Sequence, residues 1–429
     1  MRKVCEVYRV RPSFRFELQL PRSSPVFMLL AAFSVAMLPS AAIAQSTADP
    51  VSTARLRLGP FGITPSIDLA SGLDTNVFND TVDPKEDWTT TVNPKVDVWF
   101  RIGPARFAVR NNSNFSSFKE YTDQGGLGTR NEARLDLPLN RTSWFVAQTF
   151  INTRERPTVE VDSRVRRRED TVTVGTNIRA SSKTTLRLDA ARALQRFDDE
   201  ASFGGINLAT ALNRRSETGA LSLRYQVATL TTLVMQAEAA REGFDSSPLR
   251  DSESVRVSPG IEFDPHALIG GRAFVGYRRF IITSGFAPRF TGVVASVELT
   301  STIRGATRLS VQANRDVAYS YDIANAYYLL SGVGASVTHR LAQNWDVTAQ
   351  VGFQDLNYER WTFPTTIPRF VAALPPRFET VELYRGGIGY RFGESMRLSV
   401  SGDHSRRTST RVLRPYEGTR ILSAFSYGS

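Results

Sequence analysis

The stretch that decides the fold is WDVTAQVGFQ, which runs from Trp345 to Gln354. Every second residue from Trp345 to Phe353 is apolar, and the residues between them are small or polar. Successive side chains of a β-strand point to opposite faces, so this period of two predicts a strand with one apolar and one polar face. The same alternation recurs in three further segments: 221–226, 308–314 and 396–403.

Such strands suit a membrane, because one face can be apolar toward lipid while the other is polar toward a wet lumen. A soluble β-sandwich or solenoid also alternates, so the period alone leaves both open. The turns favour the membrane interpretation, since short polar turns recur about every 38 to 52 residues, with room for a strand, a longer loop and a strand. They lie at Ile102-Gly103-Pro104, Asn140-Arg141, Ser181-Ser182-Lys183, Val227-Ala228-Thr229, Asp264-Pro265-His266, Arg304-Gly305-Ala306, Ala342-Gln343-Asn344 and Gly393-Glu394-Ser395.

The sequence therefore predicts an all-β fold, a transmembrane antiparallel up-and-down β-barrel of about 18 strands, with 16 as the alternative. Short turns are expected on the periplasmic side and long loops outside. The expected strands are 63–72, 88–101, 104–121, 128–139, 142–155, 169–180, 183–197, 213–226, 229–244, 252–264, 268–284, 288–302, 305–321, 326–340, 343–360, 377–392, 395–411 and 416–427.

The N-terminus has the pattern of a secretory signal peptide. Six basic residues precede the apolar run Val26–Leu38, and the small-residue site Ala42-Ile43-Ala44 follows it. A membrane anchor is the other interpretation, although the run is short for one. We expect cleavage before Gln45, which removes six basic and two acidic residues and lowers the net charge from +11 to +7.

Three regions follow from this reading. Residues 1–44 are the predicted signal peptide, 45–62 a short periplasmic N-terminal segment and 63–429 the outer-membrane barrel. The basic stretch before the apolar run is long, so it stays open whether Met1 is the true start of the protein.

Cysteine and histidine are scarce. The single cysteine, Cys5, lies in the predicted signal peptide, so the mature chain would have neither a disulfide nor a thiolate metal site. The three histidines, His266, His339 and His404, do not stand in a pattern that makes a hydrolytic site. We expect no enzyme activity, no cofactor and no metal, and no nucleic-acid motif is present.

Eighteen strands enclose a lumen wide enough for water unless something fills it. The segment before the first strand is too short for a plug domain, so a long loop is the candidate constriction. Among the longest loops, near 156–168, 198–212 and 361–376, the last is the most apolar and the stiffest. We expect Trp361, Phe363 and Phe370 of that loop to narrow the pore.

Arginines dominate the polar faces of the expected strands, with fewer acidic residues among them. A net positive lumen would favour anions. The alternative is a lattice of arginine–carboxylate pairs across strands, which stiffens the wall and leaves little net field. The arginines expected to line the lumen are Arg106, Arg110, Arg134, Arg179, Arg187, Arg224, Arg272, Arg278, Arg308, Arg340, Arg385, Arg391 and Arg397.

A second basic feature lies in the predicted loop 156–168. Arg164, Arg166, Arg167 and Arg168 could contact lipopolysaccharide phosphates or an acidic polymer, although a run of this kind is more often a solvated loop.

The first expected hairpin, SIDLASGLDTNVF at 66–78 followed by VNPKVDVWF at 92–100, resembles the opening of the putative β-barrel porin type 2 family. The resemblance implies an outer-membrane β-barrel, and some members are associated with exopolysaccharide synthesis and export. It implies no catalytic residues. One departure is the C-terminus, where Gly428-Ser429 follow Phe425 and Tyr427 in place of a terminal aromatic residue.

Two functions remain open. The first is a porin-like channel of the bacterial outer membrane that passes anionic solutes or an acidic exopolysaccharide. The second is a structural or adhesive barrel whose lumen is closed by loops. Expected partners are outer-membrane lipid and lipopolysaccharide, the anionic solute or polymer and polysaccharide-export machinery, but no nucleic acid. The oligomeric state is not indicated.

Overall fold

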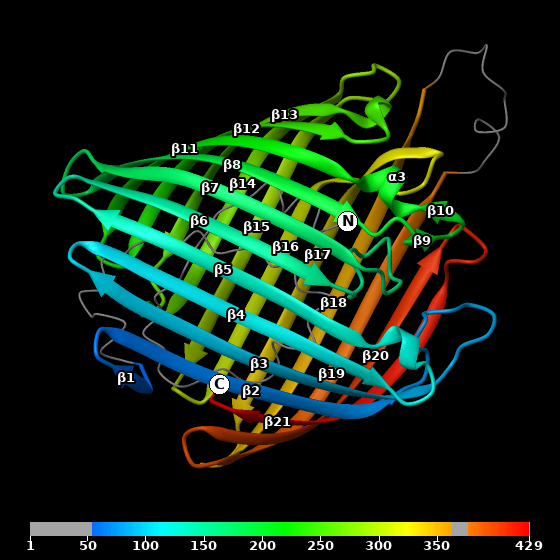
Figure 1. Ribbon diagram of the computed structural model, residues 1–429, viewed down its shortest axis with the longest axis horizontal. Helices are drawn as coiled ribbons and strands as arrows, with labels where there is room; N and C mark the ends of the chain where they lie inside the picture. Colours follow the sequence, from blue (N-terminus) through cyan, green and yellow to red (C-terminus); the bar gives the residue numbers. More distant parts are fainter. Residues whose placement is uncertain (1–53, 363–375, 429) are drawn as a thin grey trace.

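The computed structural model describes residues 54–362 and 376–428. Eighteen long strands close into one antiparallel barrel (Figure 1). They are β2 (Phe61–Asp74), β3 (Asp87–Ile102), β4 (Ala105–Phe118), β5 (Gly126–Pro138), β6 (Thr142–Thr153), β7 (Arg167–Arg179), β8 (Thr184–Phe197), β11 (Arg214–Ala228), β12 (Thr231–Phe244), β13 (Ser252–Phe263), β14 (Ile269–Ile282), β15 (Phe290–Ile303), β16 (Thr307–Tyr319), β17 (Asn325–Arg340), β18 (Trp345–Arg360), β19 (Phe378–Phe392), β20 (Met396–Ser409) and β21 (Tyr416–Tyr427). The predicted fold class and strand count are confirmed, and every predicted strand boundary lies within three residues of the observed one.

Each long strand pairs with its neighbours in the sequence, which makes the barrel an up-and-down one. The last strand, β21, closes the ring on β2, in a register that runs from Ile67 opposite Tyr427 to Asp74 opposite Arg420. Closure leaves no free strand edge, so the backbone N–H and C=O groups of the wall bond within the barrel.

The short turns all lie at the left-hand end of the barrel in Figure 1, and the long loops lie at the right-hand end. In the turn between β15 and β16, Arg304 and Gly305 have φ angles of +50° and +65°. Two successive residues with positive φ fit a type I′ turn, whose twist matches that of the flanking strands. The backbone conformation of these two residues therefore closes the β15–β16 hairpin with a tight turn.

The smaller elements are not among the eighteen long strands of the wall. They are β1 (Leu56–Leu58), η3 (Thr122–Gln124), β9 (Ser202–Phe203), β10 (Ile206–Asn207), α3 (Leu208–Leu212) and η4 (Pro248–Arg250). The helix α3 begins after Asn207, whose side chain accepts a hydrogen bond from the backbone N–H of Thr210. None of the helices in the described ranges has the length and apolarity that a membrane span requires.

The alternation predicted from the sequence produces two distinct faces. In β11 the outward side chains Leu221, Leu223 and Tyr225 are 42 to 47% exposed, whereas Ser222, on the enclosed face, is buried. Contact with lipid requires large apolar side chains at every second position, all exposed on the outward face of the strand.

An apolar core is present, but it fills the long-loop end of the barrel and does not lie between two layers. Phe280 packs edge-on against Tyr319 and Tyr327, with ring centroids 5.7 and 5.3 Å apart. Leu208 and Leu212 of α3 are completely buried in the same cluster. Loops thus contribute a core of the kind found in soluble proteins at one end of the barrel.

Candidate functional site

A loop crosses the inside of the barrel at its long-loop end. We call residues 154–166, which connect β6 to β7, the strap. Glu160 and Val161 in its middle have no exposed surface. The strap contacts the β16–β17 loop and the long-loop ends of β19 to β21. Around the ring, seven strands separate β7 from β17 in one direction, and seven separate β7 from β19 in the other. The strap therefore spans the barrel from one wall to the opposite one.

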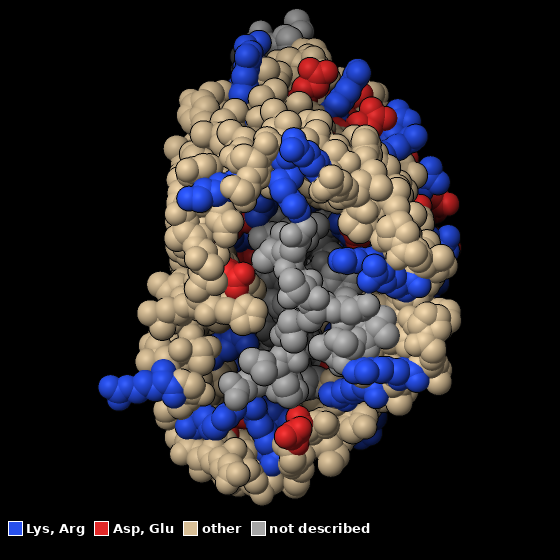
Figure 2. Space-filling model, turned by 90° about the vertical axis from the view of Figure 1, so that its left-hand side faces the viewer, with Lys and Arg blue, Asp and Glu red and all other residues tan. Residues whose placement is uncertain are grey.

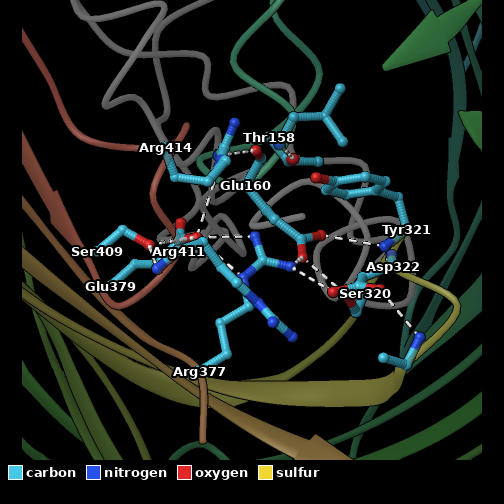
Figure 3. Close-up of polar contacts among 12 residues, drawn as sticks. Thr158, Glu160, Ser320, Tyr321, Asp322, Arg377, Glu379, Ser409, Arg411 and Arg414 are labelled. Carbon is cyan, nitrogen blue, oxygen red and sulfur yellow. Dashed lines mark hydrogen bonds and ion pairs between the residues drawn. The ribbon is translucent and has the colours of Figure 1, made fainter. Parts of the chain in front are cut away.

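Glu160 holds the tip of the strap to the far wall (Figure 3). Its carboxylate accepts a hydrogen bond from the Ser320 hydroxyl at 2.7 Å and one from the Tyr321 backbone N–H at 3.1 Å. It also forms an ion pair with Arg377 at 3.1 Å. Burial raises the pKa of Glu160 above its usual range, and Arg377 opposes that shift.

Arg377 forms ion pairs with several acidic groups around the tip of the strap. Besides Glu160, its guanidinium contacts Asp322 at 3.1 Å and Glu379 at 2.8 Å. The same group lies 3.9 Å above the ring of Tyr358. A single buried cation therefore joins the strap, the β16–β17 loop and the start of β19.

Two further arginines fix the next part of the strap. Arg407 and Arg414 form ion pairs with Asp162 at 3.3 and 3.1 Å. Arg414 also donates to the backbone carbonyl of Glu160 at 2.6 Å, and Arg407 donates to that of Val159. These arginines bind both a side chain and main-chain carbonyl groups of the strap. They therefore fix the course of its backbone as well as the position of its tip.

The loop between β8 and β11 packs beneath this network. Phe203 meets Tyr321 edge-on at 4.9 Å, and the guanidinium of Arg414 lies 4.8 Å from the Phe203 ring. Burial raises the pKa of the Tyr321 phenol to about 12. From the other side Arg250 donates to the backbone carbonyls of Ser320 and Asp322.

The predicted constriction loop 361–376 lies largely outside the described residues, and Phe363 and Phe370 are among those not described. Trp361 is half-buried and packs against the apolar cluster at the long-loop end. The loop's part in narrowing the pore stays a prediction. The strap was missed by our sequence reasoning, although Val159 to Asp162 alternate apolar and acidic residues, which is unusual for a freely solvated loop.

Most of the arginines expected to line the lumen have an acidic partner on the enclosed face of the wall. Such pairs fit the lattice alternative, because each carboxylate neutralises the cation beside it. The pairs are Arg110 with Asp97 at 2.8 Å, Arg134 with Asp136 at 2.6 Å, Arg187 with Asp189 at 2.8 Å, Arg224 with Glu262, Arg272 with Glu298 at 3.2 Å, Arg278 with Asp316 at 2.7 Å, Arg385 with Asp403 at 3.6 Å, and Arg391 and Arg397 with Asp346 at 3.1 and 3.0 Å.

The other four expected lumen residues are Arg106, Arg179, Arg308 and Arg340, which we call the rim arginines. Each lies two residues from a short turn and shares the strand face that points into the barrel. In the described part of the chain none of them has an acidic group within 4 Å. Figure 2 shows this end of the molecule, where Lys and Arg outnumber Asp and Glu around the rim. Positive charge that the wall does not neutralise is therefore found at the short-turn end.

The basic run at 164–168 is divided among different environments. Arg164 is half-buried, with its guanidinium 4.7 Å from the Phe118 ring, and partial burial lowers its pKa to about 10. Arg167 has no exposed surface and pairs with Glu169 at 2.6 Å. Arg166 is half-exposed near Asp198, and Arg168 points outward. The interpretation of the run as one solvated loop is therefore wrong for Arg164 and Arg167.

The three histidines lie apart from one another and from the strap. His266 contacts Asp264 in a short turn at 2.8 Å, and His339 contacts Thr307 at 2.8 Å. His404 lies 3.4 Å from Glu417 on the neighbouring strand. The structure does not bring them together.

Several solved structures are similar to this chain. The vanillate-bound OpdK of Pseudomonas aeruginosa aligns with a TM-score of 0.46 at 9% identity and covers 85% of this chain and 98% of its own. OccK2 (OpdF) of Pseudomonas aeruginosa in complex with glucuronate gives 0.46 at 11% identity, with the same coverage. A BenF-like porin from Pseudomonas fluorescens Pf-5 gives 0.45 at 11% identity, again covering 85% and 98%. No curated protein matches the sequence.

A family model decides the assignment. The model described as "Putative beta-barrel porin 2" matches residues 49–424, which include all the strands of the barrel wall except the last residues of β21. The expected outer-membrane location agrees with a barrel that exposes apolar side chains along its outward face. The chain belongs to this porin family and is a β-barrel protein of the bacterial outer membrane.

Proposed function

We propose that this porin-like barrel passes small anionic solutes passively across the outer membrane. The observation that carries the proposal is the position of the rim arginines, which supply cationic charge on the enclosed face without acidic partners in the described part of the chain. Along the middle of the wall the arginines are paired, so little selectivity is expected from them. The rim arginines, and not the paired arginines along the wall, would then set the preference for anions.

The strap limits what can pass. An acidic exopolysaccharide would have to thread the long-loop end as an extended chain, and the strap crosses that path. Small solutes need a much narrower opening than a polymer. We therefore favour small anions over a polymer, and polymer passage would require displacement of the strap.

Ion selectivity tests the proposal. The protein, purified from outer membranes, is inserted into planar bilayers, and the reversal potential is measured in a tenfold KCl gradient. The wild type should prefer chloride, and the quadruple variant R106Q/R179Q/R308Q/R340Q should lose most of that preference because the unneutralised charge is gone. The matched control R215Q/R241Q/R315Q/R406Q removes the same number of charges from the outward face and should keep it. Cation preference of the wild type would refute the proposal.

A second function is favoured by the strap itself. A barrel that is crossed by buried, ion-paired residues could instead be closed and act as a structural or adhesive protein through its long loops. In that case inserted protein would give no current steps, and the variants at the rim would have no electrical phenotype.

A further inference from the structure

Three arginines face outward on neighbouring strands at the long-loop end. Arg168 of β7 and both Arg192 and Arg196 of β8 are exposed. They share a face with Val172 and Leu188, which are each 42% exposed in the apolar belt that surrounds the barrel. These side chains therefore point toward the membrane and not into the lumen.

Two of these cations lie directly opposite each other. Arg168 and Arg196 are partners in the register of β7 and β8, which places their Cβ atoms about 5 Å apart. Like charges in this position are destabilising. Two acids share this face. Asp170 accepts a hydrogen bond from Gln148 at 3.0 Å, and Glu217, the register partner of Arg192, lies 3.7 Å from Arg215. None of the three arginines has an ion pair within 4 Å in the described residues. In the described residues the repulsion between Arg168 and Arg196 is therefore not offset by a direct ion pair with either acid.

The next outward arginines along the wall differ in this respect. Arg215 of β11 lies 3.7 Å from Glu217, and Arg241 of β12 lies 3.8 Å from Glu253. The β7–β8 arginines are thus a cationic patch within a row that is otherwise charge-paired.

The height of the patch on the barrel indicates what it contacts. Arg192 is the register partner of Val172, and the outward residues toward the short turns, Val174 and Leu188, are apolar. Arg168 and Arg196 lie on the other side of Arg192, toward the long loops. The guanidinium groups therefore lie at the outer border of the apolar belt, which is the level of lipid headgroups in the outer leaflet.

We propose that Arg168, Arg192 and Arg196 bind the phosphate groups of a phosphorylated glycolipid in the outer leaflet of the outer membrane. Phosphate matches the fork of the guanidinium group and can be held by two arginines at once, which turns the Arg168–Arg196 repulsion into a shared attraction. The inference rests on the outer-membrane location and does not depend on the channel proposal.

Thermal unfolding in defined vesicles tests this site. Delipidated protein is reconstituted into phosphatidylcholine vesicles with or without one-tenth bis-phosphorylated lipid A, and the unfolding midpoint is measured. Lipid A should raise the midpoint of the wild type. The variant R168Q/R196Q should lose at least half of that rise, yet in phosphatidylcholine alone it should unfold no earlier than the wild type, because the like-charge pair is gone.

The control R315Q/R406Q removes two outward arginines from the opposite part of the wall and should keep the full rise. The proposal is overturned if R168Q/R196Q keeps the full rise in unfolding midpoint, or if lipid A does not raise the midpoint of the wild type. Equal loss of the rise in both variants overturns it as well. It is also overturned if inorganic phosphate at millimolar concentration gives the same rise in vesicles without lipid A, since the site would then bind free anions.

Discussion

Arg377 is the residue that does most to hold the strap in place. It is buried, and it is the counter-cation for Glu160, Asp322 and Glu379 at distances of 2.8 to 3.1 Å. Removing one partner from a buried ionic cluster leaves the others without compensation, which costs about 3 to 5 kcal/mol. Removing Glu160 should cost less, because Arg377 keeps Asp322 and Glu379 as partners.

We therefore expect Arg377→Leu to release the strap, whereas Glu160→Gln loosens it only partly. Release of the strap should expose Arg164, which is followed by Val165, to trypsin, so the rate of cleavage within 154–166 measures the effect. Wild-type protein should be cut slowly and Arg377→Leu at least tenfold faster. Arg289→Leu, an exposed arginine at the same end, serves as the control. Equal cleavage of Arg377→Leu and the control would show that Arg377 does not hold the strap.

Among the elements, the strap is the one that crosses the barrel from one wall to the opposite one. Its two ends are fixed by β6 and β7, and its middle is fixed by side chains from β20 and the β16–β17 loop. No regular secondary structure is needed for this, because hydrogen bonds and ion pairs from the opposite wall replace the ones that a strand would make.

Replacing residues 157–163 by two glycines should raise single-channel conductance several-fold, since an occupied cross-section becomes free. Deletion of 363–375, within the loop that the sequence singled out, is the competing test in the same bilayers. A large rise only after that second deletion would place the constriction there and not at the strap. Unchanged heat-modifiability on gels confirms that each variant is still a barrel.

For the whole molecule, the decisive contact is the seam between the first and last strands of the wall. At Gly72 of β2 the two backbones approach so closely that a Cβ would lie 2.0 Å from the Ile421 carbonyl oxygen and 2.8 Å from the Leu422 Cα. Such a clash cannot be relieved by turning a side chain, because both neighbours are main-chain atoms.

Gly72→Ala should therefore impair closure of the barrel, with most of the protein failing to reach the folded, heat-modifiable form in outer membranes. Gly402→Ala, in β20, is the matched substitution, because a Cβ there has its nearest neighbour at 3.9 Å. It should assemble like the wild type. Normal assembly of Gly72→Ala would mean that β2 and β21 are further apart than this register implies.

The strands and short turns were predictable from the sequence because their signals are local. The alternation in 345–354 needs only a few consecutive residues to be recognised, and the lipid face that it predicts follows from strand geometry alone. The same strand geometry is the basis for expecting arginines on the other face. Their pairing stayed one of two alternatives, because partners such as Asp346 and Arg397 come from β18 and β20, which lie on either side of β19.

The sequence by itself determined a closed outer-membrane barrel, since period-two patterning and turn chemistry act over short distances. Only the tertiary structure decided what crosses the lumen and where charge remains. Glu160 becomes a buried anchor because Ser320 and Arg377 reach it from the opposite wall. In the described residues the rim arginines have no direct ion pair because the acids opposite two of them, Asp136 and Asp346, are held by other arginines. Both outcomes depend on contacts between distant segments, which no local pattern encodes.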